Sequence, residues 1–172
     1  ITDHGDRDSY DAFLDAVAEL QLPVFAIPGN HDRREPMRSA FAEHEYMPAA
    51  GRLNWFADVN GVRLIGLDTL VEGQGGGAVD AQTLDFLESH LNEVGASPVL
   101  LALHHPPFAS GIEFMDSIGL TGGDRLSDIL KRSAADIRVV CGHVHTAIVS
   151  SVGGATVLSA PSLCSTFDVD FR

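Results

Sequence analysis

The amino-acid sequence predicts an α/β fold with a mixed sheet. Segments with apolar residues at helical spacing alternate with short apolar runs of strand character, the arrangement in which helices connect strands. Two turn sequences, Asn60-Gly61 and Gly153-Gly154, each separate two such runs and predict antiparallel hairpins. The 172 residues show no repeat and no linker-like tract, so we expect one domain over residues 1–172.

The first part of the chain is expected to hold two helices and one strand. A helix over residues 9–20 has Ser9 as its N-cap and a stripe of apolar side chains at helical spacing. Pro23 ends this helix, and the apolar run 24–27 that follows has strand character. A second helix is expected over residues 39–46.

Strands and helices alternate in the rest of the chain. The run at 99–103 is apolar throughout, which is typical of a buried strand. We expect strands at residues 55–59, 62–67, 99–103, 137–141, 147–152 and 155–158, helices at 80–94 and 124–133, and loops at 73–77 and 111–123.

Composition and charge exclude several classes of partner. With 24 acidic and 11 basic residues, the chain has a formal net charge of −13 and a pI near 4.7. That balance argues against binding to nucleic acid or to an anionic membrane surface, both of which attract Lys and Arg. No apolar run approaches the roughly 18 residues of a membrane span. Two cysteines outside any C-x-x-C pair, Cys141 and Cys164, favour a reducing, cytoplasmic setting.

Side chains able to bind metal follow three of the expected strands directly. Five of the eight histidines lie in three short windows. Binding groups in open α/β sheets collect at the carboxyl ends of strands, so we expect these windows to converge. The windows are Gly29-Asn30-His31-Asp32, His104-His105-Pro106-Pro107 and Gly142-His143-Val144-His145.

The chemistry of the three windows favours a metal centre. Imidazoles combined with carbonyl or carboxylate oxygens suit Mn, Fe, Zn or Co. A tight turn after Gly142 would aim His143 and His145 at two different metals. Two metals roughly 3.5–4 Å apart can clamp a phosphoryl group and supply a hydroxide nucleophile. Each window alone is also compatible with a turn or a strand end, and it is their combination that favours function.

These blocks resemble the calcineurin-like metallophosphoesterase superfamily, whose signature includes Gly-Asn-His-(Asp or Glu), His-x-Pro and Gly-His-x-His. The His-His-Pro-Pro form and the stretch from Gly111 to Asp116 are most similar to the branch of class III cyclic nucleotide phosphodiesterases and bacterial glycerophosphodiesterases. The resemblance spans essentially the whole chain. It implies an α-β-β-α sandwich with mixed sheets.

Two blocks of the signature, Asp-x-His and Gly-Asp after a strand, are absent from this sequence. The best alignment places Ile1 directly after a missing Gly-Asp. We therefore expect a chain that lacks the family's N-terminal strand-helix-strand and that also stops before the usual C-terminus.

The resemblance implies a metal-ligand set in this chain. Asn30, His104 and His143 would bind one divalent metal, and His145 would bind a second. The missing blocks would supply the other ligands. We therefore expect two metals in the intact protein and one or none in this chain alone.

The resemblance also implies catalytic and substrate-binding residues. His31 would stabilise the scissile phosphate or protonate the leaving group, and Asp3 would orient His31. Asn30, His31 and His105 would contact the substrate. The segment from Phe108 to Leu120 would carry specificity, although it could equally be a packing lid.

The expected function is that of a metal-dependent phosphodiesterase. A metal-bound hydroxide would hydrolyse small diesters, either cyclic nucleotides or glycerophosphodiesters. The alternatives are a phosphomonoesterase or protein phosphatase of the same superfamily, and a non-catalytic metal-binding or interaction module. An open sheet edge would favour a homo-oligomer.

Overall fold

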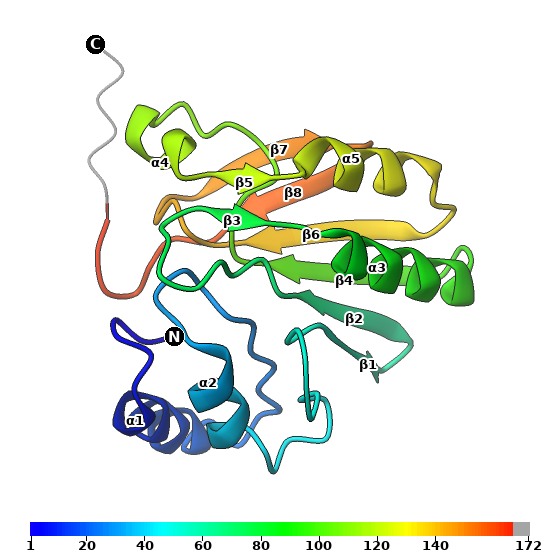
Figure 1. Cartoon of the computed structure of the whole chain (residues 1–172). Coiled ribbons are helices and arrows are strands. Elements are labelled where there is room, and N and C mark those ends of the chain that lie inside the picture. Colours follow the sequence, from blue (N-terminus) through cyan, green and yellow to red (C-terminus); the bar gives the residue numbers. More distant parts are fainter. Residues whose placement is uncertain (167–172) are drawn as a thin grey trace.

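A six-stranded mixed sheet forms the body of the fold in the computed structural model, which describes residues 1–166. Its strands are β1 (Trp55–Val59), β2 (Val62–Leu67), β4 (Pro98–Leu103), β6 (Asp136–Cys141), β7 (Ile148–Val152) and β8 (Ala155–Ser159). Their order is β1-β2-β4-β6-β8-β7, with β2, β4, β6 and β8 parallel and both edge strands antiparallel (Figure 1). The predicted α/β class with a mixed sheet is confirmed.

Helices α3 (Ala81–Val94) and α5 (Gly123–Arg132) cover one face of this sheet, whereas α1 (Arg7–Ala18) and α2 (Arg34–Ala40) pack together on its β1 side (Figure 1). The short strands β3 (Gly77–Ala78) and β5 (Leu120–Thr121) form a second, two-stranded sheet. The short helix α4 (Glu113–Ser117) immediately precedes β5. The carboxyl ends of the parallel strands all lie at the left-hand side of Figure 1.

The main core lies between α3, α5 and the sheet. Leu101, Leu103 and Val139 are fully buried on the covered face, whereas the alternate residues Leu100 and Val140 are only half-buried. Each buried Leu or Val contributes about 1.5–3 kcal/mol relative to an exposed position. Within residues 1–166, β4 and β6 therefore bury the face toward α3 and α5 more completely than the opposite face.

Both predicted hairpins are confirmed. Val59 pairs with Val62, so Asn60 and Gly61 form a two-residue turn between β1 and β2. Their φ angles of 50° and 83° belong to the left-handed region, which the primed hairpin turns require. Gly153 and Gly154 connect β7 and β8 in the same way.

The run 24–27 is extended but is not a strand, contrary to the prediction. The backbone N–H and carbonyl of Ala26 form hydrogen bonds with side chains rather than with a neighbouring strand. Its N–H donates to Tyr46 Oη at 3.0 Å, and its carbonyl accepts from Trp55 Nε1 at 2.7 Å. Phe25 also stacks on Trp55, with ring centroids 5.5 Å apart. The apolar run is therefore held by an aromatic cluster.

The first helix begins earlier than predicted because Asp6, not Ser9, is its N-cap. The Asp6 carboxylate accepts from the backbone N–H of Ser9 at 2.9 Å and also from its hydroxyl. Both residue types favour this position, and the apolar stripe does not distinguish between them.

The second helix spans Arg34–Ala40 rather than residues 39–46. It begins early because Pro36 lies in its first turn, where a missing N–H costs no intrahelical bond. Beyond it, successive turns replace the helix, with His44 N–H donating to the Phe41 carbonyl. The guanidinium of Arg38 binds the carbonyls of Pro48 and Gly51 and holds that segment against α2.

The predicted loop 111–123 contains α4 and β5. Asp116 closes the turn before α4, because its carboxylate accepts from the backbone N–H groups of Ser110 and Gly111 at 2.6 and 3.0 Å. These hydrogen bonds keep the pKa of Asp116 below its ordinary value, against the opposing effect of burial. The contact of the Asp116 carboxylate with the backbone of Ser110 and Gly111 orders this segment. The spacing of apolar residues does not reveal such a contact.

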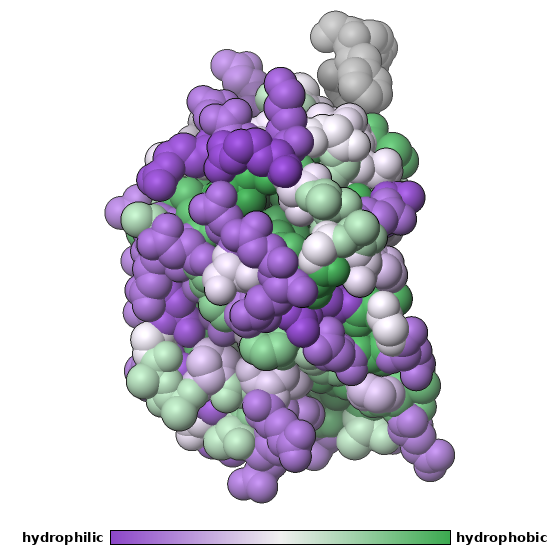
Figure 2. Space-filling view, turned by 90° about the vertical axis from the view of Figure 1, so that its right-hand side faces the viewer, coloured by the Kyte–Doolittle hydropathy of each residue, from purple (hydrophilic) through white to green (hydrophobic). Residues whose placement is uncertain are grey.

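One end of the molecule is largely hydrophilic. Figure 2 shows the end of the molecule that carries the amino ends of the parallel strands, where hydrophilic side chains cover most of the face and apolar patches lie between them. Among the described helices, none is both long and apolar enough to cross a membrane.

Candidate metal centre

The three predicted windows converge at one end of the sheet. His104 and His105 follow β4, and His143 follows β6. One ring nitrogen from each of these three residues lies within 4.8 Å of the other two. Asn30, in the turn after the extended run 24–27, places Oδ1 3.0 Å from Nε2 of His104. The parallel strands β4 and β6 deliver their histidines at their carboxyl ends, and Asn30 reaches the same place from the turn after the extended run 24–27.

Two glycines hold the imidazole of His104 in place. A Cβ at Gly29 would lie 3.0 Å from Cε1 of His104, and a Cβ at Gly142 would lie 3.4 Å from its Nδ1. The Gly142 N–H also donates to the His104 carbonyl at 3.0 Å. The glycines that open two of the windows are thus packing partners of a histidine in the third. Sequence reasoning missed this role, although the glycine that opens each of these two windows was its signal.

His143 is fixed as one tautomer. Its Nε2–H donates to the backbone carbonyl of Ile118 at 3.1 Å, which leaves Nδ1 as the nitrogen that can bind a metal. The φ angles of His143 and His145 are 69° and 54°, so a tight left-handed turn separates these two side chains, as predicted. The hydroxyl of Ser165 lies 2.9 Å from Nδ1 of His145, which stands outside the group of three histidines.

The electrostatics of the cluster suit a cation. Burial lowers the pKa of His104 well below its ordinary value, and the neighbouring His105 and His143 act in the same direction. Burial also lowers the pKa of His143. Neutral imidazoles offer nitrogen lone pairs, and Asn30 adds an amide oxygen, so this donor set fits a divalent transition metal.

His105 lies beside the cluster but differs from the expectation that it contacts substrate. Its ring is fully buried. Nε2–H donates to the Gly75 carbonyl at 3.1 Å, and Nδ1 accepts from the Thr69 hydroxyl at 2.8 Å. Burial lowers its pKa to about 4, so the ring is neutral at physiological pH. Both nitrogens are committed to the segment after β2, which leaves none for a substrate or a metal.

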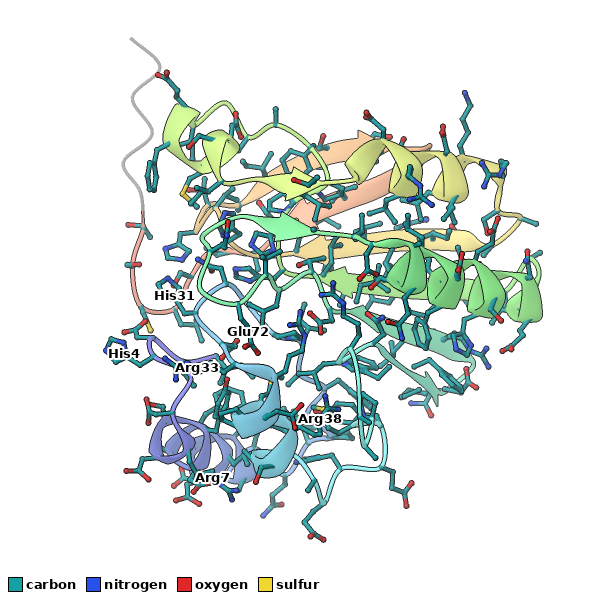
Figure 3. All side chains as sticks on the ribbon, in the orientation of Figure 1. His4, Arg7, His31, Arg33, Arg38 and Glu72 are labelled. Carbon is teal, nitrogen blue, oxygen red and sulfur yellow. The ribbon has the colours of Figure 1, made fainter. Side chains whose placement is uncertain are left out.

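A cavity of about 660 Å³ adjoins the centre, and His31 and Asp3 both line it. His31 is exposed, and its Nδ1 lies 3.3 Å from the backbone carbonyl of Asp3. The contact therefore uses the Asp3 carbonyl rather than the carboxylate. Figure 3 shows His31, Arg33 and Glu72 on the same side of the molecule, between α2 and the carboxyl ends of the strands.

Asp32 fastens the start of the chain to the His31 turn. Its buried carboxylate accepts from Gly29 N–H at 2.7 Å, Tyr10 Oη at 2.9 Å and Thr2 N–H at 3.2 Å. These bonds place Asp3, the next residue after Thr2, against His31. The sequence marks Asp32 only as the last residue of its window, so this structural role was not predicted.

Several known proteins are similar to this chain. A family model described as calcineurin-like phosphoesterase matches residues 1–147. The chain is 35% identical to a probable glycerophosphodiester phosphodiesterase of Arcobacter nitrofigilis, covering 100% of this chain and 63% of that protein. It is 32% identical to a probable cyclic nucleotide phosphodiesterase of Synechococcus, covering 98% and 64%. The chain thus spans a little less than two thirds of the length of these curated relatives.

A solved structure shares the fold. The crystal structure of a dimetal phosphatase from Danio rerio superposes with a TM-score of 0.64 at 16% identity, covering 90% of this chain and 67% of that one.

Proposed function

The chain belongs to the calcineurin-like phosphoesterase family, and from this premise we propose that it carries the active site of a metal-dependent phosphodiesterase acting on small diesters. The observation that supports the proposal most is the meeting of Asn30, His104 and His143 beside a cavity that His31 lines. The two relatives named as diesterases support the substrate class, with cyclic nucleotides and glycerophosphodiesters as the two candidates.

Asn30 Oδ1, His104 Nε2 and His143 Nδ1 would hold one divalent metal, and His145 would contribute to a second. When bound, such metals supply a Lewis acid and lower the pKa of water. The protein's part is to keep these donors neutral and fixed. Gly29 and Gly142 confine His104, and the Ile118 carbonyl sets the tautomer of His143. Mn, Fe, Zn and Co all suit the donor set.

His31 is the proposed general acid. Its Nδ1–H donates to the Asp3 carbonyl, so Nε2 is the nitrogen that can hold or give a proton at the cavity. Hydrolysis adds water to phosphorus and breaks one P–O bond. The proton on Nε2 goes to the oxygen of the departing alcohol, which would otherwise leave as an alkoxide.

Size and charge support a small substrate. A cavity of about 660 Å³ suits a small molecule, and the net charge of −13 disfavours nucleic acid.

Cys141 and Cys164 are both free thiols, which supports a reducing cytoplasmic setting. We propose that residues 1–172 form one domain.

The test measures hydrolysis of bis(p-nitrophenyl) phosphate with added Mn(II), together with metal content by plasma mass spectrometry. The protein is assayed as residues 1–172 and with any flanking residues that its coding sequence encodes. His104→Ala should lose both metal and turnover, whereas His31→Ala should keep metal and lose turnover by about 10²- to 10⁴-fold. His90→Gln on α3, outside the site, is the matched control.

Full turnover in His104→Ala would contradict the proposal. Metal bound without turnover in every form would instead support a non-catalytic metal-binding module.

A further inference from the structure

Within residues 1–166, Arg33 is a basic side chain without an acidic partner, in a protein with a net charge of −13. Among residues 1–166, seven of the ten Lys and Arg side chains form ion pairs with carboxylates. The guanidinium of Arg33 forms neither an ion pair nor a hydrogen bond within this part of the chain, although the protein carries 24 acidic residues. Arg125 and Lys131 share this property but lie on α5, away from the cavity.

The backbone and stem of Arg33 are fixed even though its head is exposed. Its N–H donates to the hydroxyl of the buried Tyr10 at 3.1 Å. A Cβ at Gly5 would lie only 2.6 Å from Cγ of Arg33, so the stem packs closely on Gly5, whose φ of 64° also favours glycine. Arg33 is thereby held at the wall of the cavity that Asn30 and His31 also line (Figure 3).

Two charged residues close to Arg33 are already engaged, Arg34 and Glu72. Arg34 forms a bidentate pair with the buried Asp68, at 2.6 and 3.0 Å. Glu72, across the cavity, accepts from the backbone N–H of Arg34 at 2.8 Å and does not pair with Arg33. Asp3 lines the cavity as well, without an ion pair to Arg33. Among the described residues that line this cavity, Arg33 is therefore the guanidinium without an ion pair, two residues from His31.

We propose that Arg33 is a specificity-determining residue that binds a second anionic group of the substrate, away from the scissile phosphorus. The site would then favour diesters whose alcohol part carries a phosphate or a carboxylate. A planar guanidinium can bind two oxygens of either group at once. This inference rests on the proposed phosphodiesterase function. It specifies in addition that the preferred substrate carries a second anionic group.

The test uses two substrates that differ by one phosphate. Thymidine 5′-(p-nitrophenyl phosphate) carries a single anionic group, and its 3′-phosphorylated form carries a second one. The protein with any encoded flanking residues should show a lower KM for the bisphosphorylated form. Arg33→Gln should raise that KM about tenfold more than it raises the KM for the first substrate, which corresponds to about 1.4 kcal/mol. Arg33→Lys should keep part of the preference, and Arg125→Gln should keep all of it.

Equal losses on both substrates would overturn the proposal, because Arg33 would then act on the scissile phosphate. An unchanged ratio in Arg33→Gln would overturn it as well. Isothermal titration calorimetry can compare the affinity for thymidine 3′,5′-bisphosphate with the affinity for thymidine 5′-phosphate. This comparison needs no turnover. If the wild type hydrolyses neither ester, the proposed function fails. Arg33 would still be supported if only its substitution weakened binding of the bisphosphate.

Discussion

Two glycines, Gly29 and Gly142, pack against the imidazole of His104. Because a Cβ at Gly29 would lie 3.0 Å from Cε1 of His104, Gly29→Ala should shift the imidazole by a few tenths of an ångström. We expect zinc affinity to fall about 10- to 100-fold, the range found when groups that orient a metal ligand are changed. Zinc titration calorimetry measures this change.

Gly123→Ala is the matched control for that variant. No atom lies within 4 Å of a Cβ at Gly123, so its zinc affinity should equal that of the wild type. Equal affinities in all three proteins would show that His104 is not held by Gly29.

His105 connects the metal centre with the segment after β2 through two hydrogen bonds. Thr69→Val removes the hydroxyl that donates to Nδ1 and leaves a buried acceptor unpaired. The free energy of unfolding should fall by about 1–3 kcal/mol. Urea denaturation measures the loss, and Thr156→Val, at an exposed position of β8, should change stability by much less. A loss in Thr156→Val as large as that in Thr69→Val would contradict the assignment.

The β1–β2 hairpin contains two glycines with different functions. Gly61 has a φ of 83° and open space around it, so Gly61→Ala should cost about 1 kcal/mol of backbone strain. A Cβ at Gly66 would lie 2.2 Å from Cε2 of Trp55, whose indole is held by the Ala26 carbonyl. Gly66→Ala should therefore cost about 3 kcal/mol, near the top of the range for an overpacked core.

Thermal and urea unfolding of both variants test this order of effects. A larger loss in Gly61→Ala than in Gly66→Ala would mean that the turn, not the Trp55 contact, limits the hairpin.

Elements whose signals are local were predictable from the sequence. The Asn60-Gly61 turn determines the register of β1 and β2, and the spacing of Leu84, Leu87 and Leu91 identifies the buried face of α3. The run 24–27 could not be assigned, because its backbone partners are Tyr46 and Trp55, far along the chain.

The same distinction applies to the site. The ends of β4 and β6 bring two windows together, and the turn after the extended run 24–27 adds the third. This convergence was predictable because each window follows an apolar run. The family resemblance assigns His104 to the same metal as Asn30, and the structure brings these two residues together. The spacing of residues alone does not show which histidine of the pair His104-His105 faces Asn30. The answer depends on Thr69 and Gly75, which bind His105 and belong to another segment.

At the scale of the whole molecule, the two cysteines report on folding. Cys141 is buried in the main core and burial raises its pKa to about 12, whereas Cys164 is exposed. An aromatic disulfide reagent should therefore label one thiol in the native protein and two in urea. Cys164→Ser should abolish the native reaction. Rapid native labelling of Cys141 would contradict a closed core.

Zinc titration of two adjacent variants tests the central claim of a metal centre most directly. His104→Gln and His105→Gln alter neighbouring imidazoles of one strand end, and circular dichroism verifies that both variants are folded. We predict that His104→Gln loses zinc affinity by at least about tenfold, whereas His105→Gln keeps it within about threefold. Loss of zinc in His105→Gln with retention in His104→Gln would contradict the ligand set, and equal retention in both would contradict the metal centre itself.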